Sequence, residues 1–253
     1  MKKIIIIGDV HHRREWEQVI EQEKTWDKII FTGDYFDSFD IPYTEGIYNF
    51  NKILELKKKH PDNVILLLGN HDIQYLPGAT IVFDYEAKYK HDIQNLLLPA
   101  IENKLIQIAH LEGKVLFSHA GISKTFVERL SNKVVDIPYE TDEEIVSMLN
   151  NVLLYKPLLF DFGVFKDRIW CDNYGNDKFQ SCTWIRPDSL CSDTVSEALQ
   201  VVGHTEHGSI IFREPGVFFI DALTEYGGFE YLVLEMGKKG AVTPLVKKLE
   251  IKN

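Results

Sequence analysis

Cysteine, positive charge and long apolar segments are all scarce in this 253-residue chain. The three cysteines, Cys171, Cys182 and Cys191, have spacings that match neither a Cys-x-x-Cys pair nor a zinc finger, which favours reduced thiols over a disulfide or a metal site. A formal charge of -10 provides no general basic face and argues against broad nucleic-acid binding. An acidic protein that acts on anions needs local positive charge, which bound divalent metal would supply.

No apolar run approaches the roughly eighteen residues of a membrane span, and the apolar run after the basic pair at residues 2–3 is too short for the core of a signal peptide. We therefore expect a cytoplasmic protein that does not bind membranes. The length allows a buried core without disulfides or structural zinc, and no internal repeat or low-complexity segment is present. We expect one domain over residues 1–253 and leave its oligomeric state open.

The N-terminal part of the chain alternates between apolar runs and helical periodicity. Continuous apolar segments at residues 3–7, 27–31 and 64–68 predict buried parallel strands. Helices are expected between them, over about 13–24 and 46–59, because apolar residues recur there at helical spacing. Strand, helix, strand, helix, strand is a βαβαβ unit, so this sheet is expected to be parallel.

The later part of the chain has a more mixed pattern. The remaining helices are expected over 84–98, closed by Pro99, and over 140–154. The remaining strands are expected at 105–110 and 115–118 around a tight turn, at 199–202, and as antiparallel strands at 209–212, 217–220 and 229–235. Residues 155–190 predict a long, mostly irregular segment, which in a compact domain is either functional or wrongly assigned.

Polar residues that can bind metal follow several of the apolar runs. They stand in the motifs Gly8-Asp9-Val10-His11, Gly33-Asp34-Tyr35-Phe36-Asp37, Gly69-Asn70-His71-Asp72, Ser118-His119-Ala120-Gly121 and Gly203-His204-Thr205. Because chemistry in layered α/β proteins lies beyond the carboxyl ends of strands, we expect these groups to converge on metal. Carboxylate and imidazole together suit Zn, Mn or Fe(II), and so many ligands suit two ions about 3.5 to 4 Å apart that share a carboxylate.

This set of motifs, in this order, resembles the calcineurin-like metallophosphoesterases over residues 4–235. With Ile220-Asp221-Ala222 and Tyr226-Gly227-Gly228, it is most similar to their phosphoprotein phosphatase and diadenosine tetraphosphatase branch. The resemblance implies an α/β fold, namely a four-layer αββα sandwich with two mixed sheets and a dimetal site at the strand ends. It also implies a phosphatase that hydrolyses phosphomonoesters with a water activated by two divalent ions. Manganese is the first expectation, and iron, zinc and nickel are the alternatives.

The resemblance further assigns a role to each motif residue. The implied metal ligands are Asp9 and His11 on the first ion, Asp34 between the ions, and Asn70, His119 and His204 on the second. His71 would donate a proton to the leaving oxygen, with Asp37 orienting its imidazole. Neighbours on an extended chain point to opposite sides, so the residues themselves also indicate that Asn70 and His71 do not share one metal. Asp72 is expected to contact the ligand residues without binding metal itself.

The chain departs from the family pattern at the phosphate clamp. Ser38 and Phe39 follow Asp37 where the phosphoprotein phosphatases have Arg-Gly, so the usual anion-binding arginine is missing from its place. The expected substitutes are Arg186 first, Arg168 second, and Arg13 or Arg14 third.

Two further departures concern the first metal. His12 replaces the glycine that usually follows Asp-x-His, and it is expected either to crowd the first metal or to contact substrate. Glu206 stands where many members have a second histidine, with His207 next to it. Whether one of these two is a ligand, or water fills the position, stays open.

Two other functions compete with monoester hydrolysis. Cleavage of a diester or a dinucleoside polyphosphate is the first, because loops and not the metal cradle choose the substrate. A metal-binding scaffold that works through protein contacts is the second. The scaffold would have no need for His71 and Asp37, and both are present.

Overall fold

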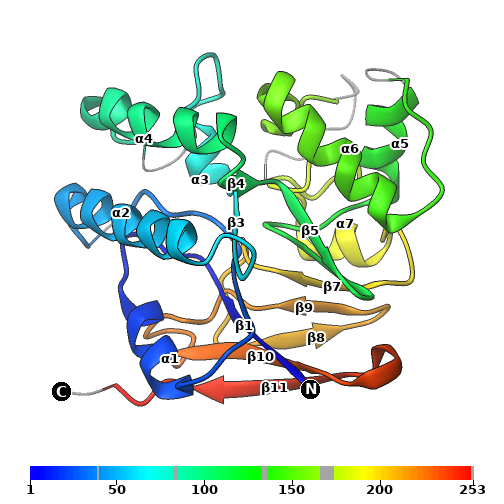
Figure 1. Ribbon diagram of the computed structural model, residues 1–253. Coiled ribbons are helices and arrows are strands. Elements are labelled where there is room, and N and C mark those ends of the chain that lie inside the picture. The colour runs from blue at the N-terminus through cyan, green and yellow to red at the C-terminus, as the bar shows by residue number, and fades with distance from the viewer. Residues whose placement is uncertain (39, 83–84, 133–135, 166–173, 252–253) are drawn as a thin grey trace.

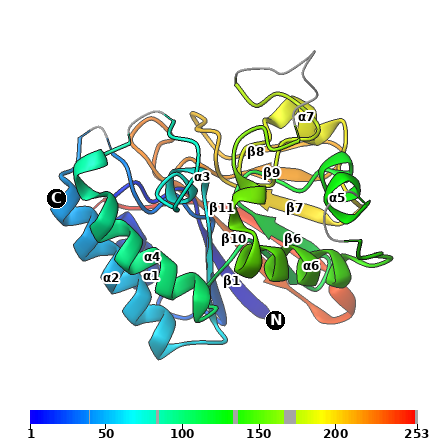
Figure 2. The ribbon, with the colours of Figure 1, turned by 90° about the horizontal axis from the view of Figure 1, so that it is seen from above.

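Two mixed β-sheets pack face to face, and helices cover the outer face of each (Figures 1 and 2). The computed structural model describes residues 1–38, 40–82, 85–132, 136–165 and 174–251. Seen from above, the outer helices form one layer on each side: α1 (Glu15–Glu23), α2 (Tyr43–Lys59) and α4 (Lys90–Glu102) on the first, and α5 (Lys124–Leu130), α6 (Asp142–Tyr155) and α7 (Pro187–Cys191) on the second. The expected αββα sandwich with two mixed sheets is confirmed.

The first sheet has six strands in the order β11-β10-β1-β2-β3-β4. They are β1 (Lys2–Ile7), β2 (Lys28–Phe31), β3 (Val64–Leu67), β4 (Ile106–Gln107), β10 (Glu230–Met236) and β11 (Val242–Lys248). The four from β1 to β4 are parallel, which confirms the expected βαβαβ unit, whereas β10 and β11 add two antiparallel strands beside β1.

The second sheet has five strands in the order β5-β6-β7-β9-β8. They are β5 (Ala109–Glu112), β6 (Val115–Ser118), β7 (Leu199–Val202), β8 (Ile211–Arg213) and β9 (Val217–Phe219). Strands β6, β7 and β9 run parallel, with an antiparallel strand at each edge. The expected antiparallel pairing holds for β8 and β9 only, because β10 leaves this sheet and pairs with β1.

The continuous apolar run of β1 is explained by burial on both faces. Ile4 and Ile6 belong to the cluster packed between the two sheets, together with Phe117 of β6. Ile5 and Ile7 point the other way, into the cluster that includes Trp16 and other residues of the outer helices. Successive side chains of β1 point into two different buried apolar clusters, so no position of the strand needs a polar residue.

Two local expectations were wrong. Pro99 lies inside α4 and does not end it, because the apolar face continues through the buried residues Ala100 and Ile101 and outweighs the hydrogen bond that proline removes. The strand expected over 105–110 is divided between the sheets: β4 pairs with β3, and β5 pairs with β6. Periodicity could not reveal this change of sheet, because both halves are apolar.

Several short elements complete the described chain. They are α3 (Asn70–Ile73), η1 (Ala87–Tyr89), η3 (Pro157–Phe160) and η4 (Lys238–Gly240). The segment over 155–190 is mostly irregular in its described part, as expected. Among the helices described, none combines the length and the apolar character that crossing a bilayer requires.

Candidate metal centre

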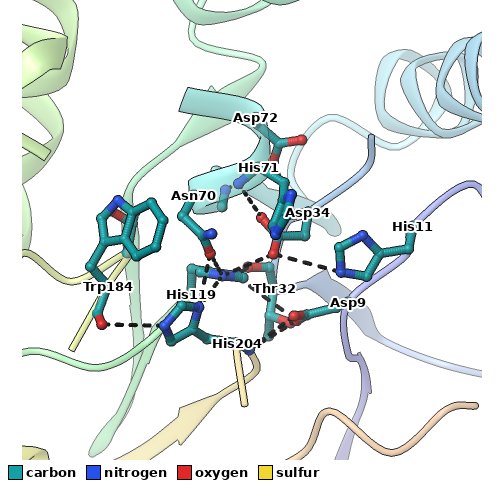
Figure 3. A network of polar contacts seen from close by, with 12 residues as sticks. Asp9, His11, Thr32, Asp34, Asn70, His71, Asp72, His119, Trp184 and His204 are labelled. Carbon is teal, nitrogen blue, oxygen red and sulfur yellow. Dashed lines mark hydrogen bonds and ion pairs between the residues drawn. The ribbon is translucent and has the colours of Figure 1, made fainter. Parts of the chain in front are cut away.

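Strands from both sheets end at one edge of the sandwich, and the loops that follow them bring the motif residues together (Figure 3). Two groups of possible ligand atoms result, each with its atoms within 4.8 Å of one another. The first group is Asp9, His11 and Asp34, and the second is Asp34, His119 and His204. Asp34 is common to both groups, and this is the position that a ligand shared by two ions requires.

The amide of Asn70 joins the second group. Its Oδ1 lies 2.8 Å from His119 Nε2 and 2.8 Å from His204 Nδ1. The two imidazole nitrogens lie 3.2 Å apart, and His119 Nε2 lies 3.3 Å from Asp34 Oδ2. Four ligand atoms from four separate loops therefore face one another around one point.

In His119 and His204, the ring nitrogen that points away from Asn70 faces a backbone carbonyl. His119 Nδ1 lies 2.9 Å from the carbonyl oxygen of Thr32, and His204 Nε2 lies 3.2 Å from that of Trp184. A carbonyl oxygen can only accept, so in the neutral imidazoles these nitrogens carry the protons, and His119 Nε2 and His204 Nδ1 present lone pairs. Lone pairs without protons between them repel, and a bound cation would turn this repulsion into coordination, so the residues fit a metal.

In the first group, His11 likewise faces a backbone carbonyl with one ring nitrogen and the other ligands with the second. His11 Nδ1 lies 2.7 Å from the carbonyl oxygen of Asp37, so its Nε2 presents a lone pair toward Asp34 Oδ2 at 3.8 Å. Both carboxylate oxygens of Asp9 accept the backbone N–H of His204, at 3.1 and 3.0 Å. The backbone of one group thereby fixes a carboxylate of the other, so the two groups form one structural unit.

Glycine precedes four of the ligands, and at two of these positions the reason is a close approach of a carboxylate. A Cβ on Gly69 would lie 2.0 Å from Asp34 Oδ1, and a Cβ on Gly203 would lie 2.1 Å from Asp9 Oδ1. Any larger residue would push the carboxylates out of place. The Gly-Asn-His-Asp and Gly-His-Thr motifs therefore leave room for ligands that come from other strands.

Asp72 holds the loop that carries Asp34. Its buried carboxylate accepts three backbone N–H groups: Oδ2 accepts those of Asp34 at 3.0 Å and Gly69 at 2.9 Å, and Oδ1 accepts that of Tyr35 at 2.9 Å. Asp34 itself lies in the left-handed region, with φ 50°, which costs energy in a residue other than glycine. These hydrogen bonds stabilise the strained turn.

Replacing Asp72 by asparagine is expected to lower the free energy of unfolding by about 1–3 kcal/mol. The amide oxygen can keep the two bonds of Oδ2, but the NH₂ group then faces the N–H of Tyr35, so one buried donor loses its acceptor. Urea unfolding in the presence of a chelator would measure the change without a contribution from metal. The exposed Asp62 supplies the control Asp62→Asn, and equal stability of the two variants would contradict the bracing role.

His71 and Asp37 form a hydrogen-bonded pair beside the ligand groups. His71 Nδ1 lies 3.0 Å from Asp37 Oδ2, and Asp37 also accepts hydrogen bonds from Gln74 Nε2 and the hydroxyl of Tyr75. Burial alone would lower the pKa of His71, but the carboxylates of Asp34 and Asp37 outweigh it and raise the pKa to about 9. The imidazole is therefore set up to carry a proton near neutral pH.

The chain carries Asn70 and His71 in a helix and not in extended backbone. Both lie in the first turn of α3, with Gly69 as the N-cap residue. The expectation that they point in different directions holds for another reason: successive helix residues are separated by about 100°, since a turn has 3.6 residues. Asn70 thus contacts His119 and His204, whereas His71 contacts Asp37.

Residues 2–225 match the family model of the calcineurin-like phosphoesterases. The chain belongs to this family. Two solved structures are similar to it: a protein serine/threonine phosphatase from Saccharomyces cerevisiae with similarity to human phosphatase PP5 (16% identity, TM-score 0.57, 100% of this chain and 81% of that one), and a mutant of a cold-active protein tyrosine phosphatase (18% identity, TM-score 0.56, 99% and 81%). At this identity they show the fold. The expected family and enzyme class, a hydrolase of phosphoric esters, are confirmed.

Several buried carboxylates lie close together in the site of this phosphoesterase, and their charges favour a cation nearby. Burial, Asp221 and Asp34 raise the pKa of Asp9, and burial, Glu206 and Asp34 raise the pKa of Asp221 to about 7. For Asp34, burial is outweighed by the histidines His119 and His71, which hold its pKa well below the usual range. Carboxylates that crowd in this way favour a bound cation.

Two of the histidine ligands, His204 and His11, favour the neutral form, which is the form that binds metal. Burial lowers the pKa of His204, and the nearby positive charge of Arg186 lowers it further. Burial also lowers the pKa of His11, and Asp34 opposes this effect only in part. Metal would therefore meet unprotonated nitrogens on both sides of the centre.

A cavity of about 250 Å³ opens above the ligands. Besides most of the ligands it is lined by Asp221 and Thr224, which the motifs had not placed there, and by Glu206, whose role as a ligand the sequence left open. Asp221 lies beside Asp9, and Glu206 Oε1 accepts a hydrogen bond from the Thr224 hydroxyl at 2.8 Å. A signal for Asp221 existed in the sequence: it ends the apolar run at 217–220, just as Asp9 ends the run of β1.

The arginines expected to bind phosphate in this phosphoesterase differ in whether they line the cavity. Arg186 and Arg13 line the cavity, whereas Arg14 is bound to Glu17 at 2.7 Å outside it. Arg186 donates to the Tyr174 carbonyl at 3.0 Å and to the Thr205 hydroxyl at 3.2 Å. Arg168, like Cys171, lies outside the described residues.

The structure places His12 and His207 away from the cavity. His12 is 1% exposed, its Nδ1 lies 3.0 Å from the carbonyl oxygen of Ile41, and its ring fills the space that a side chain at Gly46 would need. Its side chain therefore does not line the cavity above the ligands, and its contact with a metal or with substrate stays a prediction. The ring of His207 packs against Phe219, with centroids 5.9 Å apart.

Proposed function

We propose that this phosphoesterase hydrolyses phosphomonoesters, either on proteins or on small molecules, with the aid of two divalent metal ions. One observation carries the proposal: the proton-bearing pair His71–Asp37 and two groups of convergent lone pairs line the same cavity. A scaffold that only binds metal would not need a proton donor beside the ions. Hydrolysis needs both.

His71 is the proton donor in this mechanism. Asp37 holds Nδ1 and keeps the imidazolium favoured, which leaves the Nε2 proton for the leaving oxygen of the ester. Gln74 and Tyr75 hold the Asp37 carboxylate in place from the other side. The pair is thus oriented before substrate arrives, so little reorganisation is required during the reaction.

The metal ligands expected from the motifs are Asp9, His11, Asp34, Asn70, His119 and His204. Bound divalent ions would supply the remaining chemistry, because they lower the pKa of a water between them and offset the charge of the phosphoryl group. Oxygen and imidazole donors without thiolate suit manganese, our first choice, and also iron, zinc and nickel. Asp34 would serve both ions, since it is the residue common to the two groups.

Arg186 supports a phosphorylated substrate. It lines the cavity on the side of His204, and its backbone begins α7, so the side chain is attached to a regular element. A guanidinium binds two oxygens of a phosphoryl group at once, which suits it to an anion clamp. We propose Arg186 as the substrate-binding arginine in place of the one missing after Asp37.

A screen of phosphorylated compounds with Mn, Ni, Co, Zn and Mg tests the proposal. The compounds are p-nitrophenyl phosphate, phosphopeptides, nucleotides, a dinucleoside polyphosphate and bis-p-nitrophenyl phosphate. The expected result is release of inorganic phosphate from monoesters, fastest with Mn. Preferential cleavage of the bis-ester or the dinucleoside polyphosphate would replace the proposal by the diesterase or polyphosphatase function. No hydrolysis of any compound by the metal-loaded protein would favour the scaffold.

We further propose that residues 1–253 act as one unit in the cytoplasm. The free thiols of Cys182, which is buried, and Cys191 support a reducing compartment. Residues of both sheets contribute to one centre, which supports a single unit.

A further inference from the structure

Arg13 is the second arginine of the cavity, and no motif accounts for it. It lies on the side of His11, whereas Arg186 lies on the side of His204. In Figure 3 these sides are marked by His11 at the right and Trp184 at the left. The two arginines therefore reach the cavity from loops that follow strands of different sheets.

An unusual turn brings Arg13 to the cavity. His11 and His12 are consecutive residues in the left-handed region, with φ 42° and 67°, so the chain curls back directly after β1. The N–H of Arg13 then donates to the carbonyl of Val10 at 2.7 Å, and its own carbonyl accepts from Asn49 Nδ2 at 2.7 Å. Both ends of the Arg13 backbone are thereby fixed.

Helix α2 holds this turn through two buried contacts. Asn49 is 1% exposed and also accepts a hydrogen bond from Trp16 Nε1 at 2.8 Å, so the amide that holds Arg13 is itself held. The ring of His12 packs over Gly46 of the same helix. Helix α2 thus fixes the backbone position of Arg13.

The guanidinium of Arg13 is close enough to Asp221 to oppose the rise in the pKa of that carboxyl that burial and Glu206 cause. Within the described part of the chain, no hydrogen bond or ion pair of 4.0 Å or less involves this guanidinium. Its neighbour Arg14 differs, because Arg14 binds Glu17 and lies over the ring of Tyr48 at 5.3 Å. Ser38, where an arginine would be expected, also lines the cavity, and its hydroxyl donates to Asp40 at 2.9 Å. The short side chain of Ser38 supplies no positive charge.

We propose that Arg13 binds a terminal phosphoryl oxygen of the substrate opposite Arg186 and thereby selects monoesters over diesters. The inference rests on the proposed function. A monoester dianion has three non-bridging oxygens and two charges, so it can engage the ions and both arginines at once. A diester has two such oxygens and one charge, so one arginine gains little from it.

The test compares Arg13→Ala with Arg14→Ala, which removes the same charge from the adjacent, already paired position. Binding of inorganic phosphate to the manganese-loaded proteins is measured by calorimetry, and kcat/KM is measured for p-nitrophenyl phosphate and bis-p-nitrophenyl phosphate. We expect Arg13→Ala to weaken phosphate binding and monoester kcat/KM on the order of ten- to a hundredfold. The diester value should change less than about threefold, and Arg14→Ala should behave as the native protein.

Arg13→Lys separates charge from geometry, and an intermediate phosphate affinity is expected because ammonium lacks the planar fork. Phosphate affinity of Arg13→Ala within about twofold of the native value would overturn the proposal, as would equal losses on both esters. These outcomes are distinct from failure of the proposed function. In that case the native protein hydrolyses neither ester, and the phosphate affinities alone still decide the role of Arg13.

Discussion

Replacing His71 by alanine is expected to lower kcat on phenyl phosphate by a factor of about 10²–10⁴ while both metals remain bound. The variant loses the imidazolium that Asp37 holds and that would protonate the leaving phenolate. The loss should be smaller on p-nitrophenyl phosphate, whose leaving group is a weaker base and needs less help from an acid. Steady-state kinetics on the two substrates and metal analysis of the purified protein measure these effects.

The pH profile gives the same prediction a second readout. Since the acid must be protonated, native activity should fall as the pH rises through the pKa of His71, and this basic limb should be absent from His71→Ala. His91, an exposed histidine at the start of α4, supplies the control His91→Ala, which should retain both rate and profile. Unchanged turnover of phenyl phosphate by His71→Ala would remove His71 from the mechanism.

Replacing Asp34 by asparagine is expected to cost the protein at least one of its two metals and nearly all activity. Its Oδ2 faces His119 Nε2 at 3.3 Å and His11 Nε2 at 3.8 Å, so one change weakens both ligand groups. Its Oδ1 also accepts the N–H of His71 at 2.9 Å, which joins the acid to the metal centre. Loss of a charge shared by two cations affects each of them.

Metal content after gel filtration, measured by elemental analysis, is the direct test for Asp34→Asn. We expect fewer than two ions per chain where the native protein holds two. Asp62→Asn removes the same charge from an exposed loop before β3 and should keep both ions. Retention of two ions by Asp34→Asn would exclude the bridging role, whatever the activity.

The sequence predicted the first three strands and the polar residues that meet beyond them because both depend on short-range pattern. Asp9, Asp34 and Asn70 each follow an apolar run, and the carboxyl ends of parallel neighbours must meet at one edge. Long-range pairing was not accessible in the same way. Nothing in the local pattern of β10 distinguishes pairing with β1 from pairing with β9, since its alternate faces are buried in either case.

Apart from Asp221, the parts of the site that were missed are groups whose position depends on the fold, and main-chain carbonyls are the clearest case. The carbonyls of Thr32 and Trp184 fix the protons of His119 and His204, and every residue type has such a carbonyl. Arg13 was one of several candidates because its direction depends on two left-handed residues, which sequence does not specify outside glycine. Residue type predicts ligands better than it predicts what orients them.

The pairing of β1 with β10 also determines when the centre can form during synthesis. Asp9 follows β1, yet the antiparallel partner of β1 is Glu230–Met236, and the N–H that holds Asp9 belongs to His204. Contacts this far apart in the chain close slowly, and they cannot close until β10 has left the ribosome. Metal capture should therefore be a late event in the life of each molecule, after most of the sandwich has assembled.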